Sequence, residues 1–203
     1  MKKSITWFLL LAMAVSPLVA VSNDYIAGYR QGYLDGSIGV ASEYPEGSKS
    51  TATSQFEIRY FVDDFGDPTD KGYVTQRGFP TGTFSNSATR NSRITWYLIL
   101  SKTEASFVIN EYGSYRVTGS SAYPDHYDIS IKESDGNVLT FAGENHSDRI
   151  SLRDRDIDRF VNIISTGEEV KISIRKKSNY DNSSYNLGNV SFDGAKELYD
   201  QLK

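Results

Sequence analysis

Apolar residues at helical spacing mark one stretch near the C-terminal end of the chain. The positions i, i+3, i+4 and i+7 hold Ile157, Phe160, Val161 and Ile164. This spacing gives a helix over residues 154–166 a single apolar face, so the helix needs a surface to pack against. Gly167 follows, and alternation of apolar and polar residues over 170–174 then predicts a strand with one buried face. The helix is therefore expected to lie on a sheet.

Alternation, or a short apolar run, recurs along most of the chain from Gln55 onward. We expect strands at about 56–62, 73–79, 81–87, 94–100, 105–112, 127–132, 138–141, 150–152, 170–174 and 185–192. The run 94–100 has no water-facing side, which predicts a central strand that forms a hairpin with 105–112. Asp135-Gly136 predicts a type I′ turn, and apolar spacing over 195–202 predicts a short C-terminal helix. This pattern is typical of an antiparallel β-sandwich or jelly-roll-like domain, which we expect over residues 55–203.

The N-terminus has the pattern of a secretory signal peptide over residues 1–20. Lys2 and Lys3 form a basic start, 5–15 is apolar, and 16–20 is rich in small residues. The apolar run is shorter than the roughly 20 residues of a membrane-spanning helix, which favours cleavage over a membrane anchor. We expect a bacterial protein that is periplasmic or secreted, with no transmembrane anchor after cleavage of the signal.

Residues 21–54 are predicted to form a Gly- and Tyr-rich N-terminal arm and linker. Gly28, Gly32 and Gly36 recur every four residues, and tyrosines recur at the same interval. On a helix this spacing makes a smooth groove that another helix could approach closely. Each glycine also weakens such a helix by roughly 1 kcal/mol relative to alanine. The segment is therefore interpreted either as an assembly surface or as a flexible arm.

Composition narrows the classes of partner. The chain has no cysteine, which excludes disulfides and thiolate metal sites. The formal net charge of −4 becomes −6 once Lys2 and Lys3 are removed, so nucleic acid and anionic lipid are not expected as partners. Aromatic residues make up 13% of the chain and include 14 tyrosines, which suits a sheet-rich protein with tyrosine on half-buried faces.

Three sequence blocks carry a resemblance to known proteins. They are Asp64-Phe65-Gly66-Asp67-Pro68-Thr69, Gly82-Thr83-Phe84-Ser85-Asn86-Ser87-Ala88-Thr89, and Asn145-His146-Ser147-Asp148-Arg149. With these blocks the chain resembles a group of uncharacterised exported bacterial proteins. More loosely, it is similar to invasion-associated or secretion-accessory β-sandwich proteins, although those often carry cysteines. The resemblance implies an exported β-sandwich and no particular activity.

An acidic loop is the best candidate for a metal site. Asp63, Asp64, Asp67 and Asp70 lie close together in sequence around a glycine, and such hard oxygen ligands suit Ca²⁺. Their spacing matches no EF-hand loop, and Asp-Pro is ordinary turn chemistry. The alternative interpretation is a solvated hairpin whose carboxylates accept hydrogen bonds from backbone N–H groups. No other cofactor is expected.

The sequence contains few residues arranged in a known catalytic motif. The only histidines are His126 and His146, and the chain has neither an HExxH nor a GxSxG motif. His146-Ser147-Asp148 cannot form a triad directly, because neighbouring side chains on a strand point to opposite faces. Asp148 and Arg149 are instead expected to form a structural ion pair or to tie a loop down. No residue is therefore assigned as catalytic, and a carboxylate-based hydrolase stays open only as an alternative.

The sequence favours a non-enzymatic exported protein that binds another protein or a glycan. Tyrosine and tryptophan are effective contact residues because they bury a large area with few rotatable bonds. The aromatic residues expected in loops, as candidates for contact, are Phe65, Tyr112, Tyr115, Tyr123 and Tyr180. Packing at the rim of the domain is the alternative role for these rings. A structural envelope or secretion-accessory subunit that assembles through the glycine-bearing arm is a further alternative.

Overall fold

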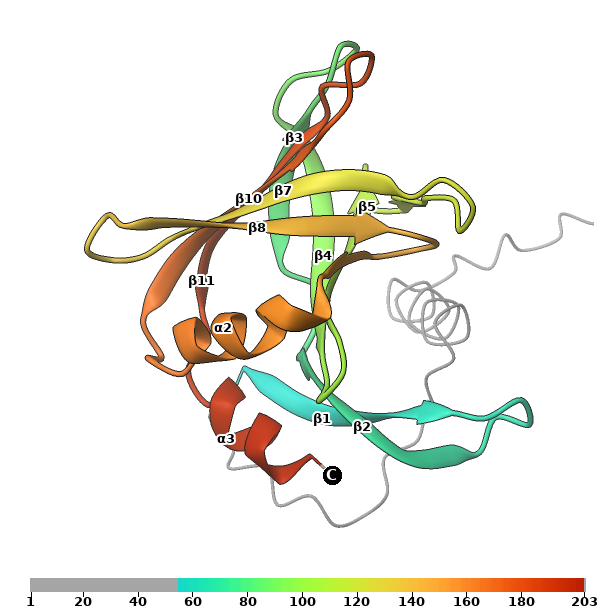
Figure 1. Cartoon of the computed structure of the whole chain (residues 1–203), viewed down its shortest axis with the longest axis vertical. Coiled ribbons are helices and arrows are strands. Elements are labelled where there is room, and N and C mark those ends of the chain that lie inside the picture. Colours follow the sequence, from blue (N-terminus) through green and yellow to red (C-terminus); the bar gives the residue numbers. More distant parts are fainter. Residues whose placement is uncertain (1–54, 203) are drawn as a thin grey trace, which may run out of the picture.

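The computed structural model describes residues 55–202, which form an antiparallel β-structure with two helices (Figure 1). The strands are β1 (Phe56–Val62), β2 (Pro68–Gln76), β3 (Thr81–Ser85), β4 (Ser92–Leu100), β5 (Ala105–Glu111), β6 (Tyr115–Arg116), β7 (Asp125–Lys132), β8 (Val138–Asn145), β9 (Ile150–Leu152), β10 (Glu169–Lys176) and β11 (Ser184–Ser191). The helices are α2 (Asp154–Ile164) and α3 (Ala195–Gln201). Within this part of the chain, no helix is long and apolar enough to cross a membrane.

The sheet closes on itself, so the prediction of a β-sandwich or jelly-roll is wrong. The strand order β4-β3-β11-β10-β7-β8-β9-β5 returns to its start because β4 also pairs with β5, which gives an antiparallel barrel of eight strands. A sandwich would leave two facing sheets with open edges, whereas here the β4–β5 ladder runs over seven residue pairs, from Ile94↔Glu111 to Leu100↔Ala105. Alternating strands bury one face equally well in either architecture, so only the pairing of distant strands distinguishes them.

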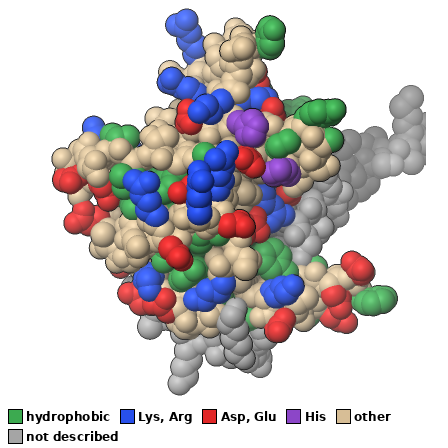
Figure 2. All heavy atoms as spheres, viewed as in Figure 1, with side chains coloured by type: hydrophobic (Ala, Val, Ile, Leu, Met, Phe, Trp, Pro, Cys, Tyr) green, Lys and Arg blue, Asp and Glu red, His purple; other side chains and the backbone are tan. Residues whose placement is uncertain are grey.

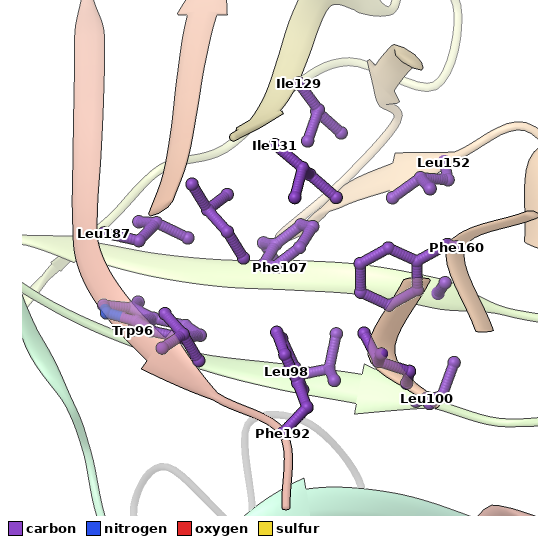
Figure 3. Close-up of a cluster of buried hydrophobic side chains, with 14 of the residues drawn as sticks. Trp96, Leu98, Leu100, Phe107, Ile129, Ile131, Leu152, Phe160, Leu187 and Phe192 are labelled. Carbon is purple, nitrogen blue, oxygen red and sulfur yellow. The ribbon is translucent and has the colours of Figure 1, made fainter. Parts of the chain in front are cut away.

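The barrel interior is an apolar core that α2 seals at one end. The helix ends at Ile164, close to the predicted boundary, and its buried residues are Ile157, Phe160, Val161, Ile163 and Ile164. Figure 3 shows Phe160 entering the core beside Leu100 and Leu152. The Phe160 ring makes edge-to-face contacts, with centroid distances of 6.0 Å, to Phe107 of β5 and to Phe192 after β11. Helix and barrel therefore share one hydrophobic core.

The β1–β2 hairpin and α3 lie beside the sealed end. β2 joins the barrel through the single pair Val74↔Leu100, and α3 packs against both strands of the hairpin (Figure 1). Phe56 of β1 stacks on Phe192 at a centroid distance of 5.7 Å, which extends the aromatic contacts of the core into the hairpin. The predicted C-terminal helix is confirmed as α3, and the predicted strand 73–79 begins earlier, at Pro68, and ends at Gln76.

Two hairpin turns show where turn chemistry departs from expectation. Asp135-Gly136 does join β7 to β8, but only Gly136 has a positive φ, of 91°, so the turn is not type I′. The turn with two positive φ values is Tyr112-Gly113, at 52° and 80°, between β5 and β6. A non-glycine residue rarely adopts this conformation, and here it orients an exposed aromatic ring.

Candidate functional site

The inward-facing rows of four strands change from apolar to polar at the end of the barrel opposite α2. Ile109 is followed by Glu111 in β5, Ile129 is preceded by Tyr127 in β7, Ile174 is followed by Lys176 in β10, and Leu187 is preceded by Tyr185 in β11. Strand register brings three of these ends together, since Lys176 pairs with Tyr127 and Ile174 pairs with Tyr185. The open end of the barrel is therefore polar and aromatic.

A cavity of about 400 Å³ lies at this open end, and we call it the mouth cavity. Its lining includes four tyrosines, two cations and two carboxylates, which are Tyr115, Tyr127, Tyr180, Tyr185, Arg116, Lys176, Glu111 and Asp181. Small-molecule sites in proteins have volumes of roughly 300–1,000 Å³ and occur in the mouths of β-barrels. An eight-stranded barrel is also about the size that can hold one small ligand. Both the position and the size of the mouth cavity suit a ligand.

The hydroxyl of Tyr185 crosses the inside of the barrel to Glu111. It donates to Glu111 Oε1 at 2.9 Å, although β3 and β4 separate β11 from β5 in the sheet. Burial raises the pKa of Tyr185, and the neighbouring Glu111 carboxylate raises it further. The phenol is therefore neutral at physiological pH. Phe84 of β3, which pairs with Tyr185 in the β3–β11 ladder, stacks against the Tyr185 ring at a centroid distance of 6.2 Å.

Lys176 is held between two carboxylates. Its Nζ lies 2.9 Å from Asp181 Oδ2 and 3.0 Å from Asp125 Oδ2. Burial alone would lower the pKa of Lys176, but the hydrogen bonds to Asp181 and Asp125 outweigh it and raise the pKa. Asp181 also accepts hydrogen bonds from the backbone N–H and hydroxyl of Ser183, and its pKa is lowered because these bonds and Lys176 outweigh burial. Both groups of the pair are thus charged near neutral pH.

Arg116 is anchored in the same way on the other side of the mouth cavity. Its Nη1 lies 3.1 Å from Asp148 Oδ2, and its Nη2 donates to the hydroxyl of Tyr97 at 3.4 Å. Asp148 also accepts from Arg149 Nε at 2.9 Å, which confirms the predicted Asp148–Arg149 ion pair. Burial works against the charged form of Asp148, but Arg149 and Arg116 outweigh it and lower the pKa of this carboxyl. Burial raises the pKa of Tyr97 to about 12.

A loop after β6 completes the wall of the mouth cavity, and buried Asn145 holds it in place. Asn145 Nδ2 donates to the carbonyl of Val117 at 3.2 Å, and Val117 lines the cavity. Gly119 approaches so closely that an added Cβ would lie 2.0 Å from the carbonyl oxygen of Asn145. Burial raises the pKa of Tyr127 in the same wall to about 12, so its hydroxyl also stays neutral. The wall is thus fixed by packing and hydrogen bonds before any ligand binds.

The structure separates the five predicted aromatic contact residues into two groups. All of them are exposed, from 56% for Tyr112 to 100% for Tyr180. Tyr115 and Tyr180 line the mouth cavity, and Tyr112 supports Tyr115 through an edge-to-face contact at 6.3 Å. Phe65 lies at the tip of the β1–β2 hairpin and Tyr123 in the link between β6 and β7, and neither lines the cavity. Three of the five predicted contact residues, Tyr112, Tyr115 and Tyr180, therefore lie at or beside the mouth cavity.

The predicted calcium loop is a hairpin turn in which the carboxylate of Asp63 binds backbone N–H groups of the turn itself. Asp63 Oδ1 accepts hydrogen bonds from the backbone N–H groups of Phe65 at 2.9 Å and Asp67 at 3.0 Å. Asp64 and Asp70 are also exposed in or beside this turn. Over residues 55–202, no three His, Asp or Glu side chains are grouped so that they could hold a metal ion. The arrangement corresponds to the alternative interpretation, a solvated hairpin.

The two histidines lie on the outside of the barrel around one carboxylate. His146 Nε2 is 3.2 Å from Glu144 Oε2, and His126 Nδ1 is 3.8 Å from Glu144 Oε1. Hydrogen bonds from His146 and Arg153 lower the pKa of Glu144. The hydroxyl of Ser147 donates to Asp148 at 3.2 Å, so His146 and Ser147 bond to different carboxylates. The three adjacent triad residue types therefore do not work as a unit.

Some predictions concern residues that the structure does not describe. The signal peptide over 1–20, the arm over 21–54 and the assembly residues Gly28, Gly32 and Gly36 all lie outside the described residues. Export and assembly through these glycines therefore stay predictions.

The charged residues of the mouth cavity were missed by sequence reasoning, although a signal for them exists. In β10 the inward row Val170, Ile172, Ile174 continues at the same two-residue interval into Lys176. A charge that extends an apolar row marks the place where a strand leaves the core. Without the closed barrel, however, nothing in the sequence shows that Lys176, Glu111 and Arg116 meet at one opening.

Comparisons with known proteins add no relative. No family model, no curated protein and no solved structure matches this chain. The resemblance to exported β-sandwich proteins accordingly remains an expectation.

Proposed function

We propose that this protein binds a glycan segment in the mouth cavity. The observation that carries the proposal is the lining of this cavity, which combines the exposed rings of Tyr115 and Tyr180 with hydrogen-bonding groups at the open end of a sealed barrel. A sugar ring presents an apolar C–H face and a rim of hydroxyl groups. Flat aromatic rings suit the first, and neutral phenols, amides and carboxylates suit the second.

The charges of the mouth cavity favour an uncharged polar group. The lining holds two cations and two carboxylates, so its formal charge is zero. Lys176 is committed to Asp125 and Asp181, and Arg116 is committed to Asp148, which leaves little charge to attract an ion. Such paired groups still accept and donate hydrogen bonds at their remaining positions. This pattern fits sugar hydroxyls better than a phosphate or an ammonium group.

Binding is favoured over catalysis by the protonation states of the titratable groups in the cavity. A general acid or base works best when its pKa lies near the operating pH. The lowered pKa of Asp181, the raised pKa of Lys176 and the raised pKa of Tyr127, about 12, move all three away from neutrality. Glu111 is hydrogen-bonded to Tyr185 and serves as an acceptor. We therefore infer a binding protein, and the predicted export would place it where extracellular glycans occur.

The proposal is tested by titrating the purified protein with a panel of glucan, mannan, galactan and xylan hexasaccharides in a calorimeter. We expect at least one to bind, and the double variant Tyr115→Ala/Tyr180→Ala to lose about 1 kcal/mol or more of binding free energy per ring. Tyr123→Ala is the matched control, because Tyr123 is 85% exposed but does not line the cavity.

Two results would count against the proposal. Absence of binding to every hexasaccharide in the panel would favour a protein as the partner of the same tyrosines. Equal losses of affinity in the double variant and in Tyr123→Ala would show that binding occurs elsewhere. Chromatography of the sugars after incubation also checks for cleavage, and shortened products would identify a hydrolase with Glu111 and Asp181 as its candidate carboxylates.

A further inference from the structure

A second hollow adjoins the mouth cavity at the tips of two hairpins. It has a volume of about 550 Å³ and is lined by residues 85–91, from the end of β3 through the β3–β4 loop, together with Asn182 of the β10–β11 loop and Ser184 at the start of β11. We call it the loop hollow. Asn86 and Ser87 line both the loop hollow and the mouth cavity, so the two spaces adjoin at these residues. In Figure 1 these two loops project together at the end of the molecule opposite α2.

The wall of the loop hollow is shaped by its own hydrogen bonds. Asn86 Oδ1 accepts from the backbone N–H groups of Ala88 at 2.9 Å and Thr89 at 3.0 Å, and Asn86 N donates to the carbonyl of Thr89 at 2.9 Å. Ser85 Oγ accepts from Asn91 N at 3.0 Å, where Asn91 has a positive φ of 53°. A loop ordered in this way loses little conformational freedom when a ligand binds. The loop hollow is therefore a preformed surface.

The charge of the loop hollow differs from that of the mouth cavity. Arg90 is the one charged residue among those that line it, and no carboxylate of residues 55–202 pairs with it. The cations of the mouth cavity, Arg116 and Lys176, both have such partners. Figure 2 shows Lys and Arg side chains at this upper end of the molecule and acidic side chains at the tip of the β1–β2 hairpin. An unpaired guanidinium beside hydroxyl and amide groups suits a planar carboxylate.

We propose that the ligand is an acidic glycan that spans both spaces, with one sugar ring in the mouth cavity and the carboxylate of a neighbouring uronic acid on Arg90. This inference rests on the proposed function and specifies its ligand. Because the two spaces adjoin at Asn86 and Ser87, an extended ligand can reach both, and Arg90, the one charged residue that lines the loop hollow, gives its negative charge a partner.

The test uses matched pairs of sugars. Glucan, mannan and galactan hexasaccharides are each compared with the corresponding C6-oxidised hexauronate by calorimetry at low and at high salt. We expect one uronate to bind about three- to fivefold more tightly than its neutral counterpart at low salt, as for an exposed ion pair, and the difference to shrink at high salt. Arg90→Gln should abolish the difference by weakening the binding of the uronate.

Arg93→Gln is the matched control, because Arg93 is an exposed arginine on β4 that lines neither space. Equal binding of neutral and acidic sugars, unaffected by Arg90→Gln, would overturn the acidic assignment and leave the proposed function standing. Equal weakening of both sugars by Arg90→Gln would also overturn it, because Arg90 would then contact the neutral ring. No binding of any sugar would overturn the proposed function and this inference together.

Discussion

Individual side chains around the open end of the barrel are fixed by partners of opposite charge. Asp148 is the centre of one such group, since it contacts both Arg116 and Arg149, and the side chains of Arg116 and Asp148 are only 14% and 23% exposed. Removing one partner of such an ion pair destabilises the folded protein, because the remaining charge is left partly desolvated. The shape of the cavity wall near Arg116 therefore depends on a residue that does not line the cavity.

Replacing Asp148 should make the free energy of unfolding depend less on pH in the acidic range. The lowered pKa of Asp148 means that its contribution to folding is fully present above the ordinary carboxyl pKa of about 4 and is lost as the pH falls through the lower folded value. We expect Asp148→Asn to reduce the free energy of unfolding by about 1–3 kcal/mol at pH 7. The difference from the unaltered protein should shrink toward pH 3.

Urea unfolding at pH 7 and pH 3 measures both effects. Asp64→Asn is the control, because Asp64 is exposed in the β1–β2 turn and should change stability little at either pH. A constant difference between Asp148→Asn and the unaltered protein at both pH values would show that Asp148 acts through packing and not through its charge.

At this scale the sequence predicted the partners of some residues and not of others. Asp148 and Arg149 are adjacent in the chain, and their ion pair followed from that proximity. Tyr115 and Tyr180 were predicted as candidate contact residues because they were expected in loops. The ion pair of Lys176 with Asp125 could not be predicted, since Asp125 lies 51 positions away and the β7–β10 ladder brings the two together.

Among the elements, α2 determines which end of the barrel is closed. Its apolar face is buried, and the contacts of Phe160 with Phe107 and Phe192 connect the helix to β5 and to the segment before α3. The sequence predicted this helix well, because a 3.6-residue apolar period over three turns has few alternatives. It did not predict that the helix would cover the end of a barrel instead of the face of a sheet.

Truncating Phe160 should be among the most destabilising single changes. The side chain is 0% exposed, and removing a buried phenylalanine ring typically costs about 3–5 kcal/mol. We expect Phe160→Ala to lower the free energy of unfolding by that amount, measured by urea unfolding with Trp96 fluorescence as the signal. Asn162→Ala, at an exposed position of the same helix, should have little effect. A loss below 1 kcal/mol for Phe160→Ala would contradict the role of α2 as a seal.

For the whole molecule, closure of the barrel depends on short ladders between strands that are distant in sequence. The β3–β11 ladder has three residue pairs, which are Thr83↔Asn186, Phe84↔Tyr185 and Ser85↔Ser184. The sequence correctly gave β4 with β5 and β7 with β8 as neighbours, because short links join those strands. It could not give β3 with β11, and this pairing is one of those that make the structure a barrel and not a sandwich.

Gly82 permits the close approach of β3 to β11. A Cβ at this position would lie 2.3 Å from the carbonyl oxygen of Asn186, so a larger side chain must push the strands apart. We expect Gly82→Val to reduce the free energy of unfolding by about 1–3 kcal/mol. Hydrogen exchange should show the largest loss of protection in β3 and β11. Thr81→Val, at the neighbouring exposed position, is the control, and equal protection in both variants would contradict a steric role for Gly82.

The sealed end of the barrel also determines how the protein can be attached to a surface. The described chain begins beside β1 and finishes after α3, and both lie away from the two projecting loops (Figure 1). A sensor chip or a fluorescent label coupled through the C-terminal residues would face away from Arg90, Tyr115 and Tyr180. Immobilised molecules should therefore keep the proposed ligand-binding surface accessible to ligands supplied in solution.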